Sequence, residues 1–140
     1  ILWFKTAEPR VRFDLEQITG TVPIIKAYAG MGIGDGIISL LDPEKIDGVV
    51  IEALGAGNLP PLAAREIKSL MDKGVPVVLV SRCFNGIAEP VYAYEGGGVK
   101  LQEDGVMFVK ELNAPKARLK LLIALSAGLE DQELKDYIEG

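Results

Sequence analysis

The stretch that decides the fold is residues 49–81, which read VVIEALGAGNLPPLAAREIKSLMDKGVPVVLVS. Its ends, Val49–Ala53 and Val75–Ser81, are short runs rich in β-branched apolar residues, which are typical of strands buried on both faces. Between them, Pro61–Lys73 carries apolar residues on one face and charged residues on the other, which predicts an amphipathic helix. Strand, helix and strand in this order predict a right-handed crossover between parallel strands.

The same alternation continues on both sides of this stretch. Further strands are expected at Thr21–Ala29 and Gly105–Val109, and further helices at Ile33–Leu41, Pro115–Ala127 and Asp131–Glu139. Asn113 is the expected cap of the helix at Pro115, whereas the glycines around Ile33 also fit a loop. The pattern predicts an α/β fold: a three-layer α/β/α, Rossmann-like domain at residues 21–140, with a mostly parallel four-stranded sheet and helices on both faces.

Residues 1–20 mix aromatic and charged residues without a clear period, and we interpret them as an interdomain linker or arm. The chain begins at Ile1 without an initiator Met, which indicates that it was cut from something longer.

Composition limits the classes of partner. The formal net charge is −5. The densest basic group, Lys116, Arg118 and Lys120, is spread round a predicted helix, and we interpret it as a solvated face. We therefore expect no nucleic acid partner. No apolar run is long enough for a membrane span. The single cysteine, Cys83, excludes an internal disulfide and fits a cytoplasmic location, and the absence of histidine excludes the usual zinc sites and histidine dyads.

Ligands of such sheets bind beyond the carboxyl ends of the strands, where the GAGN loop, Gly55–Asn58, is found. A dinucleotide fingerprint needs a third small residue, but Pro60 stands at that position, and no phosphate-binding GK[ST] sequence follows. A nucleotide is therefore disfavoured. Asn58 either caps the following helix, which local sequence favours, or presents its amide to another kind of ligand.

Other polar residues at the strand ends do not complete a catalytic set. Ser81 has no base to activate it, and a structural or binding role is favoured. Cys83 beside Arg82 could have a lowered pKa, but a buried structural thiol is the favoured interpretation. Glu95 follows Tyr94 and precedes a glycine run; it either binds an ammonium group or, as these residues alone favour, is a solvated loop carboxylate. No catalytic residue is predicted.

Several motifs together resemble one known family. They are TVPIIKAYAGM, VVIEALGAGNLPP, GVPVVLVSRCFNG, YAYEGGG and LNAPKARLKLLIAL. In this order and spacing they resemble the C-terminal domain of bacterial-type L-asparaginases, in the asparaginase/glutaminase family, from about Gly20 to Leu129.

This resemblance implies an enzyme that hydrolyses L-asparagine to L-aspartate and ammonia through an acyl-enzyme, with no metal or organic cofactor. The family's threonine nucleophile lies in a TGGTI-like motif of an N-terminal domain, together with a second Thr, an Asp and a Lys. None of those motifs occurs here, so the isolated chain is expected to be inactive. Intact family members are dimers or tetramers in which the C-terminal domain of one subunit closes the active site of its neighbour.

The same resemblance implies two substrate-binding residues. Asn58 stands at the asparagine that reaches across the subunit interface, and Glu95 stands near a glutamate that contacts the substrate's α-amino group. Two alternatives stay open: a noncatalytic dimerisation or asparagine-sensing module of the same fold, and the asparaginase-like subunit of a tRNA-dependent amidotransferase, which the acidic charge disfavours. The sequence leaves the preference between asparagine and glutamine undecided.

Overall fold

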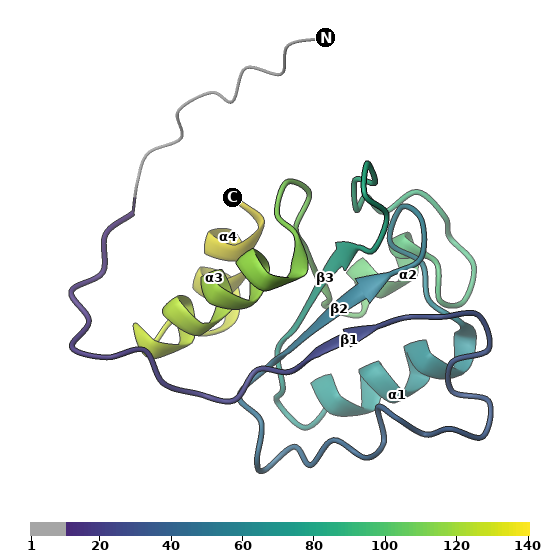
Figure 1. The fold of residues 1–140 in the computed structure, drawn as a ribbon, viewed down its shortest axis with the longest axis horizontal. Coiled ribbons are helices and arrows are strands. Elements are labelled where there is room, and N and C mark those ends of the chain that lie inside the picture. The colour runs from purple at the N-terminus through teal and green to yellow at the C-terminus, as the bar shows by residue number, and fades with distance from the viewer. Residues whose placement is uncertain (1–10) are drawn as a thin grey trace, which may run out of the picture.

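The computed structural model describes residues 11–140 and places a parallel four-stranded sheet at their centre (Figure 1). The strands lie in chain order: β1 (Ile24–Lys26), β2 (Val49–Ala53), β3 (Val77–Ser81) and β4 (Met107–Phe108). One row of paired residues crosses the whole sheet, from Ile25 through Ile51 and Leu79 to Phe108. All the carboxyl ends therefore meet at one edge, as the strand–helix alternation predicts.

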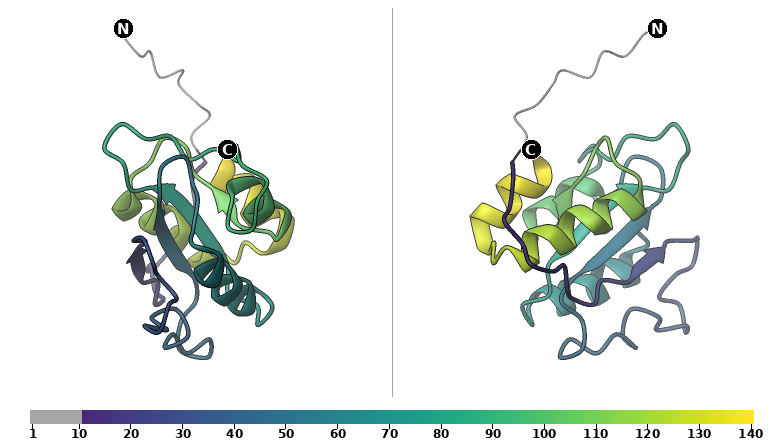
Figure 2. Two further views of the ribbon diagram at one scale, coloured as in Figure 1. Left: turned by 90° about the vertical axis from the view of Figure 1, so that its right-hand side faces the viewer. Right: turned by 60° about the vertical axis from the view of Figure 1, so that its left-hand side comes forward.

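Helices cover both faces of this sheet (Figures 1 and 2). They are α1 (Pro61–Met71), α2 (Gly98–Glu103), α3 (Ala114–Ser126) and α4 (Asp131–Glu139). Ile67 of α1 and Leu101 of α2 belong to one buried apolar cluster, whereas Leu121 of α3 and Ile138 of α4 belong to another. The predicted three-layer α/β/α architecture is confirmed.

The central strands read as continuous apolar runs because both of their faces are buried. Ile51 and Leu79 point into the cluster beneath α1 and α2, while their neighbours Val50 and Val78 point into the cluster beneath α3 and α4. All four side chains have an exposed fraction of 0%. Such double burial is what distinguishes a parallel sheet from a half-solvated antiparallel one.

Most of the predicted elements occur, with shifted ends. The strand expected at Thr21–Ala29 contracts to the three residues of β1, and the one expected at Gly105–Val109 contracts to β4. Helix α1 begins at Pro61 as predicted, because the first helical position needs no N–H donor. Asn113 caps α3 as predicted: its Oδ1 accepts a hydrogen bond from the backbone N–H of Lys116 at 3.1 Å.

One predicted helix is wrong and one helix was missed. Residues 33–41 form turns, because Gly34 and Gly36 have φ of +78° and +53°, in the left-handed region that a right-handed helix excludes. The missed helix is α2, which has six residues and follows directly on a glycine run. On its exposed side, Lys100 Nζ forms ion pairs with Glu103 Oε2 and Asp104 Oδ1, each at 3.4 Å.

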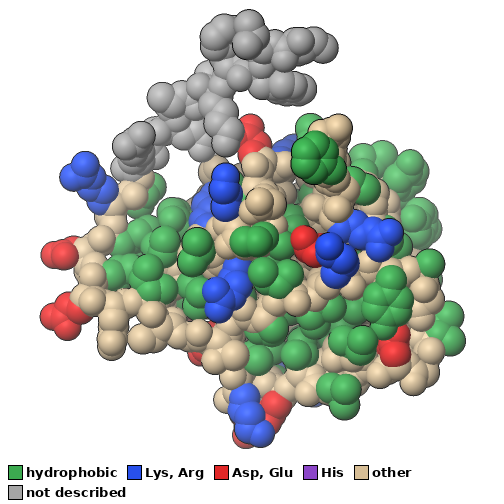
Figure 3. All heavy atoms as spheres, viewed as in Figure 1, with side chains coloured by type: hydrophobic (Ala, Val, Ile, Leu, Met, Phe, Trp, Pro, Cys, Tyr) green, Lys and Arg blue, Asp and Glu red, His purple; other side chains and the backbone are tan. Residues whose placement is uncertain are grey.

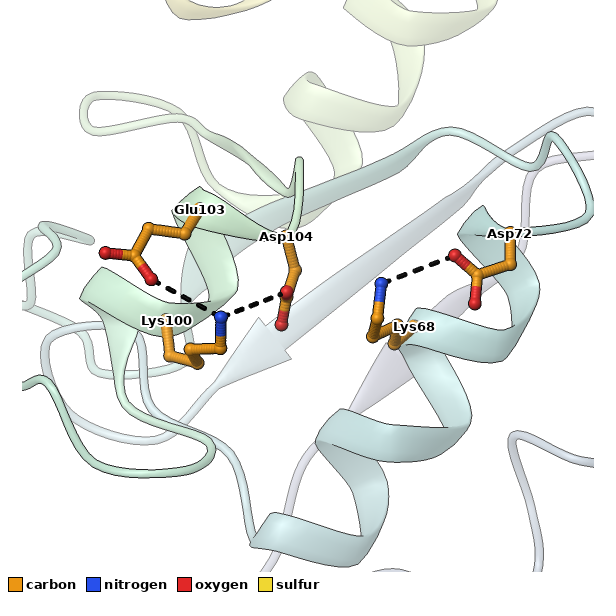
Figure 4. A network of polar contacts seen from close by, with 5 residues as sticks. All are labelled: Lys68, Asp72, Lys100, Glu103 and Asp104. Carbon is orange, nitrogen blue, oxygen red and sulfur yellow. Dashed lines mark hydrogen bonds and ion pairs between the residues drawn. The ribbon is translucent and has the colours of Figure 1, made fainter.

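Figure 4 shows this cluster beside the equivalent ion pair of α1, between Lys68 and Asp72 at 3.4 Å. Both sets join positions three or four residues apart, which face one another on a helix. They belong to the solvent-facing sides of the two helices that cover one face of the sheet.

Residues 11–20 of the expected linker pack on α3 and α4, as the right-hand view of Figure 2 shows. Phe13 meets the ring of Tyr137 edge-on at a centroid distance of 5.2 Å. Farther along, the backbone N–H of Thr19 donates to Ser126 Oγ at 3.1 Å. The rest of the expected linker, residues 1–10, lies outside the described residues.

The basic residues of α3 are not a wholly solvated face. Arg118 Nε donates to the backbone carbonyl of Val22 at 2.6 Å, and Lys120 Nζ donates to that of Ile138 at 2.9 Å. These two side chains thus attach α3 to the chain before β1 and to α4.

In the part of the chain that the structure describes, no helix is long and apolar enough to cross a membrane.

Candidate functional site

The GAGN loop, Gly55–Asn58, is a closed turn at the carboxyl end of β2. Leu54 and Asn58 exchange two backbone hydrogen bonds of 2.9 Å each, which fixes the backbone of Asn58. Gly57 has φ of +113°, and a Cβ at this position would lie 2.8 Å from Phe108 Cε1. The loop therefore rests on the core of the sheet through a contact that only glycine permits.

Asn58 does not cap the helix that follows it, so the interpretation favoured by local sequence is wrong. Pro60 occupies the N-cap of α1, and no side chain caps that helix. Instead, Asn58 Oδ1 accepts a hydrogen bond of 3.3 Å from the backbone N–H of Gly98, forty residues farther along the chain. The side chain is half-buried at the carboxyl edge of the sheet.

The segment 89–98 is joined to the GAGN loop along its length. The Glu89 N–H donates to the Ala56 carbonyl, and the Leu59 N–H donates to the Gly96 carbonyl, both at 2.8 Å. A Cβ on Gly96 would lie 2.2 Å from the Leu59 carbonyl oxygen, so this approach requires glycine. Gly96 thus permits close packing against Leu59, the residue that follows the GAGN loop.

Glu95 is held in a two-point ion pair with Arg65 of α1. Arg65 Nε lies 2.5 Å from Glu95 Oε1, and Nη2 lies 3.0 Å from Oε2. The Arg65 hydrogen bonds lower the pKa of Glu95 below the ordinary glutamate value. Both side chains are more than half exposed, so water screens the pair and its net contribution to stability is small.

The structure brings both predicted binding residues to one edge of the domain. Asn58 and Glu95 are linked through the 89–98 segment and through α1, which begins just after the GAGN loop. Sequence reasoning missed their partners, Gly98 and Arg65. Arg65 reads as part of the solvated face of an amphipathic helix, and no local pattern connects it with a carboxylate thirty residues away.

Ser81 and Arg82 serve the structure of this edge. Ser81 Oγ donates to the Gly55 carbonyl at 2.6 Å and accepts from the Cys83 N–H at 3.1 Å. Arg82 Nη1 donates to the Ala27 carbonyl at 2.6 Å and so joins the ends of β3 and β1. The favoured interpretation of Cys83 as a buried thiol is wrong, because the residue is exposed.

Asp35 is a further polar residue that sequence reasoning did not single out. It accepts hydrogen bonds from the Tyr28 hydroxyl and, at 2.9 Å, from the Gly32 N–H. The bond with Tyr28 is the main cause that lowers the pKa of Asp35 and raises that of Tyr28. The pair closes the glycine-rich turn after β1.

The loop between β3 and α2 exposes large apolar side chains. They are Phe84, Ile87, Val91, Tyr92 and Tyr94, with exposed fractions from 48% to 99%. Figure 3 shows apolar side chains gathered at the upper right, over the loops at the carboxyl ends of β2 and β3 in Figure 1. The loop thus exposes several large apolar side chains, of the kind that mark a contact surface when they are contiguous.

Two cavities of the domain lie away from Asn58 and Glu95. A cavity of about 290 Å³ lies between Ile38–Leu41 and α1, and another of about 490 Å³ lies at the amino ends of β3 and β4. The predicted binding residues stand outside both. Among residues 11–140, no group of histidine, cysteine and carboxylate side chains is arranged to hold a metal ion.

Comparison with known proteins gives a consistent result. The family model of the glutaminase/asparaginase C-terminal domain matches residues 21–138. The chain is 43% identical over 133 residues to a probable L-asparaginase from Deinococcus radiodurans, an alignment that covers 95% of this chain and 39% of the relative. It is also 31% identical over 132 residues to one of the subunits of a glutamyl-tRNA(Gln) amidotransferase from Pyrococcus furiosus, covering 94% of this chain and 29% of that protein.

The crystal structure of L-asparaginase I from Vibrio cholerae superposes on this chain with a TM-score of 0.74 and 26% identity. The superposition covers 96% of this chain and 40% of that one. The chain thus spans less than half the length of each of these relatives.

Proposed function

Because this chain belongs to the glutaminase/asparaginase family as a C-terminal domain, we propose that residues 21–140 complete the substrate site of an L-asparaginase. The observation that carries the proposal is the position of Asn58 and Glu95 at one edge of the domain. Asn58 lies on the GAGN loop and Glu95 on the 89–98 segment, and hydrogen bonds join the two. The reaction is hydrolysis of L-asparagine to L-aspartate and ammonia.

In this proposal the chain binds substrate and the reacting groups lie elsewhere. Ser81 Oγ is engaged by backbone groups, and the sequence contains no histidine to activate a hydroxyl. The threonine nucleophile and its Thr, Asp and Lys partners belong to an N-terminal domain that residues 1–20 would connect to this one. The domain alone is therefore inactive in this account, and it uses no cofactor.

Glu95 supplies the charge that complements a substrate ammonium group. In the structure both oxygens of this carboxylate accept hydrogen bonds from Arg65. Because the ion pair is exposed, little free energy is lost when Glu95 exchanges Arg65 for a substrate ammonium group or binds both at once. Asn58 complements Glu95 as a neutral group that adds no charge to the site.

The open edge favours closure by a second subunit. The Glu95 side chain is 52% exposed, Asn58 is half-buried, and Phe84, on the loop that follows β3, is 99% exposed. A second subunit that covers the exposed apolar side chains of this loop removes them from water and encloses the bound amino acid. We therefore infer a homodimer or tetramer in which this edge faces the reacting groups of a neighbouring subunit, in a cytoplasmic enzyme.

A component of a tRNA-dependent amidotransferase is the second candidate, because the Pyrococcus relative aligns over nearly the whole chain. The higher identity to a probable L-asparaginase favours the first candidate. Arg118 and Lys120 belong to the densest basic group of the sequence, and each donates to a backbone carbonyl within the domain. Together with the net charge of −5, this disfavours a tRNA as the partner.

Ammonia release tests the proposal. The full-length protein and the 140-residue chain are each incubated with L-asparagine and with L-glutamine, and free ammonia is measured. We expect release from L-asparagine by the full-length protein and none by the chain alone. Hydrolysis by the isolated chain at an enzymatic rate contradicts the assignment of the nucleophile to another domain.

A further inference from the structure

A groove of about 490 Å³ lies at the amino ends of β3 and β4, at the opposite end of the strands from the GAGN loop. Its walls come from both helical layers: the ends of α1 and α2 on one side of the sheet, and the connection from α3 to α4 on the other. Such a volume lies within the range of about 300 to 1,000 Å³ that small-molecule sites have. We call this hollow the amino-end groove.

The amino-end groove offers apolar surface to a ligand. Met71, Pro76 and Leu125 line it and are half-buried, so part of each side chain remains in contact with solvent. Gly74 and Gly105 also line it, and a Cβ on either glycine would meet nothing within 4 Å. The groove is therefore open beside its apolar wall, and a hydrocarbon group that enters it leaves water for apolar contacts.

The charged side chains of this groove are mostly acidic. Asp47, Asp104, Glu130 and Asp131 line it, against one basic residue, Lys135. Four carboxylates and one ammonium group give the lining a formal charge of −3. The electrostatic complement of such a lining is a cation.

Two of these carboxylates have no partner in the described part of the chain. Glu130 is the N-cap of α4 but makes no capping hydrogen bond, and no donor reaches the Asp131 side chain either. Lys135 stands one turn along α4 from Asp131, yet the two form no ion pair. The helix dipole favours acidic residues at this position but leaves their oxygens free to accept hydrogen bonds from a ligand.

We propose that the amino-end groove binds an organic cation with an apolar body, such as the n-hexylammonium ion. The hydrocarbon chain lies against Met71, Pro76 and Leu125, and the ammonium group meets the carboxylates of Glu130 and Asp131. This site is separate from the edge that holds Asn58 and Glu95, so it does not depend on the proposed function.

Calorimetric titration of the full-length protein tests the two halves of this recognition. The n-hexylammonium ion carries both the charge and the hydrocarbon chain, hexanoate reverses the charge, and 1-hexanol removes it. We expect saturable binding of the n-hexylammonium ion, weaker binding of 1-hexanol and no binding of hexanoate. The affinity for the n-hexylammonium ion should fall as salt is added, because salt screens the exposed carboxylates.

Substitutions locate the bound cation. Asp131→Asn should weaken binding about 2- to 5-fold, the range for an exposed charge pair, and Lys135→Gln should strengthen it by a similar factor. Asparagine suits this position because Asp131 has φ of +46°, which asparagine tolerates. Glu133→Gln is the matched control: it makes the same change of charge in the first turn of α4, but Glu133 does not line the groove.

Each remaining outcome contradicts the inference. No saturable binding of the n-hexylammonium ion, or equal binding of 1-hexanol, would show that the groove does not select a cation. Unchanged affinity in both Asp131→Asn and Lys135→Gln would place the ion elsewhere, and loss of binding in Glu95→Gln would place it at the edge near Asn58. Equal urea midpoints of the variants and the unsubstituted protein establish that the compared proteins are folded.

Discussion

The contact between Gly57 and the sheet can be tested by one added methyl group. In Gly57→Ala the new Cβ meets Phe108 Cε1 at 2.8 Å and Leu79 Cδ2 at 3.1 Å. The same substitution forces an L-residue into φ of +113°. Both atoms that it strikes belong to core side chains that cannot move aside without shifting the sheet.

Two costs add in this variant. The left-handed backbone costs about 1 to 2 kcal/mol for a residue with a Cβ, and overpacking of a filled core costs about 1 to 3 kcal/mol. The expected loss is therefore about 2 to 5 kcal/mol, against a total stability of about 5 to 15 kcal/mol for an ordinary domain.

Gly105→Ala isolates the packing part of this loss. Gly105 has φ of +107°, close to that of Gly57, but a Cβ there meets nothing within 4 Å. Urea unfolding of the two variants and of the unsubstituted chain gives the comparison, and Gly57→Ala should be less stable than Gly105→Ala by about 1 to 3 kcal/mol. Equal stability of the two variants would refute the claim that the GAGN loop rests on Phe108.

Two further predictions concern side-chain contacts. Arg65→Gln should raise the pKa of Glu95 towards the ordinary glutamate value, as followed by carboxyl-carbon NMR, whereas Lys68→Gln one turn along α1 should leave it in place. Since the folded pKa of Glu95 is lowered, the pair stabilises the domain above the unfolded pKa and loses this contribution as pH falls through the folded value. Asn113→Ala should cost about 1 kcal/mol in urea unfolding, because it leaves the Lys116 N–H uncapped; an unchanged midpoint would show that the cap contributes nothing.

The layers of this fold are predictable because their signals are local. The run from Val49 to Ala53 is apolar at every position but one, and the helix at Pro61 has a clear apolar face with a proline start. Each pattern matches the burial that the element has in the structure. Helix α2 has no comparable pattern, since Leu101 is its one fully buried large side chain and its start lies in glycines.

The site was only partly predictable, because its contacts join distant residues. The position of Asn58 after a buried strand is enough to place it at the carboxyl edge. Its partner is the backbone N–H of Gly98, a group that every residue except proline carries and that no sequence pattern marks. Likewise, Cys83 was expected to be buried, but the loop after β3 turns outwards to solvent at this point.

The contribution of this edge to a neighbouring active site is the central claim, and a crystal structure of the full-length protein with L-aspartate tests it most directly. We predict that the Asn58 amide group and a Glu95 carboxylate oxygen lie at hydrogen-bond distance, about 3 Å, from an L-aspartate bound among the reacting groups of another subunit. An L-aspartate enclosed without contact to either residue, or contacted only by residues of one subunit, would contradict the account.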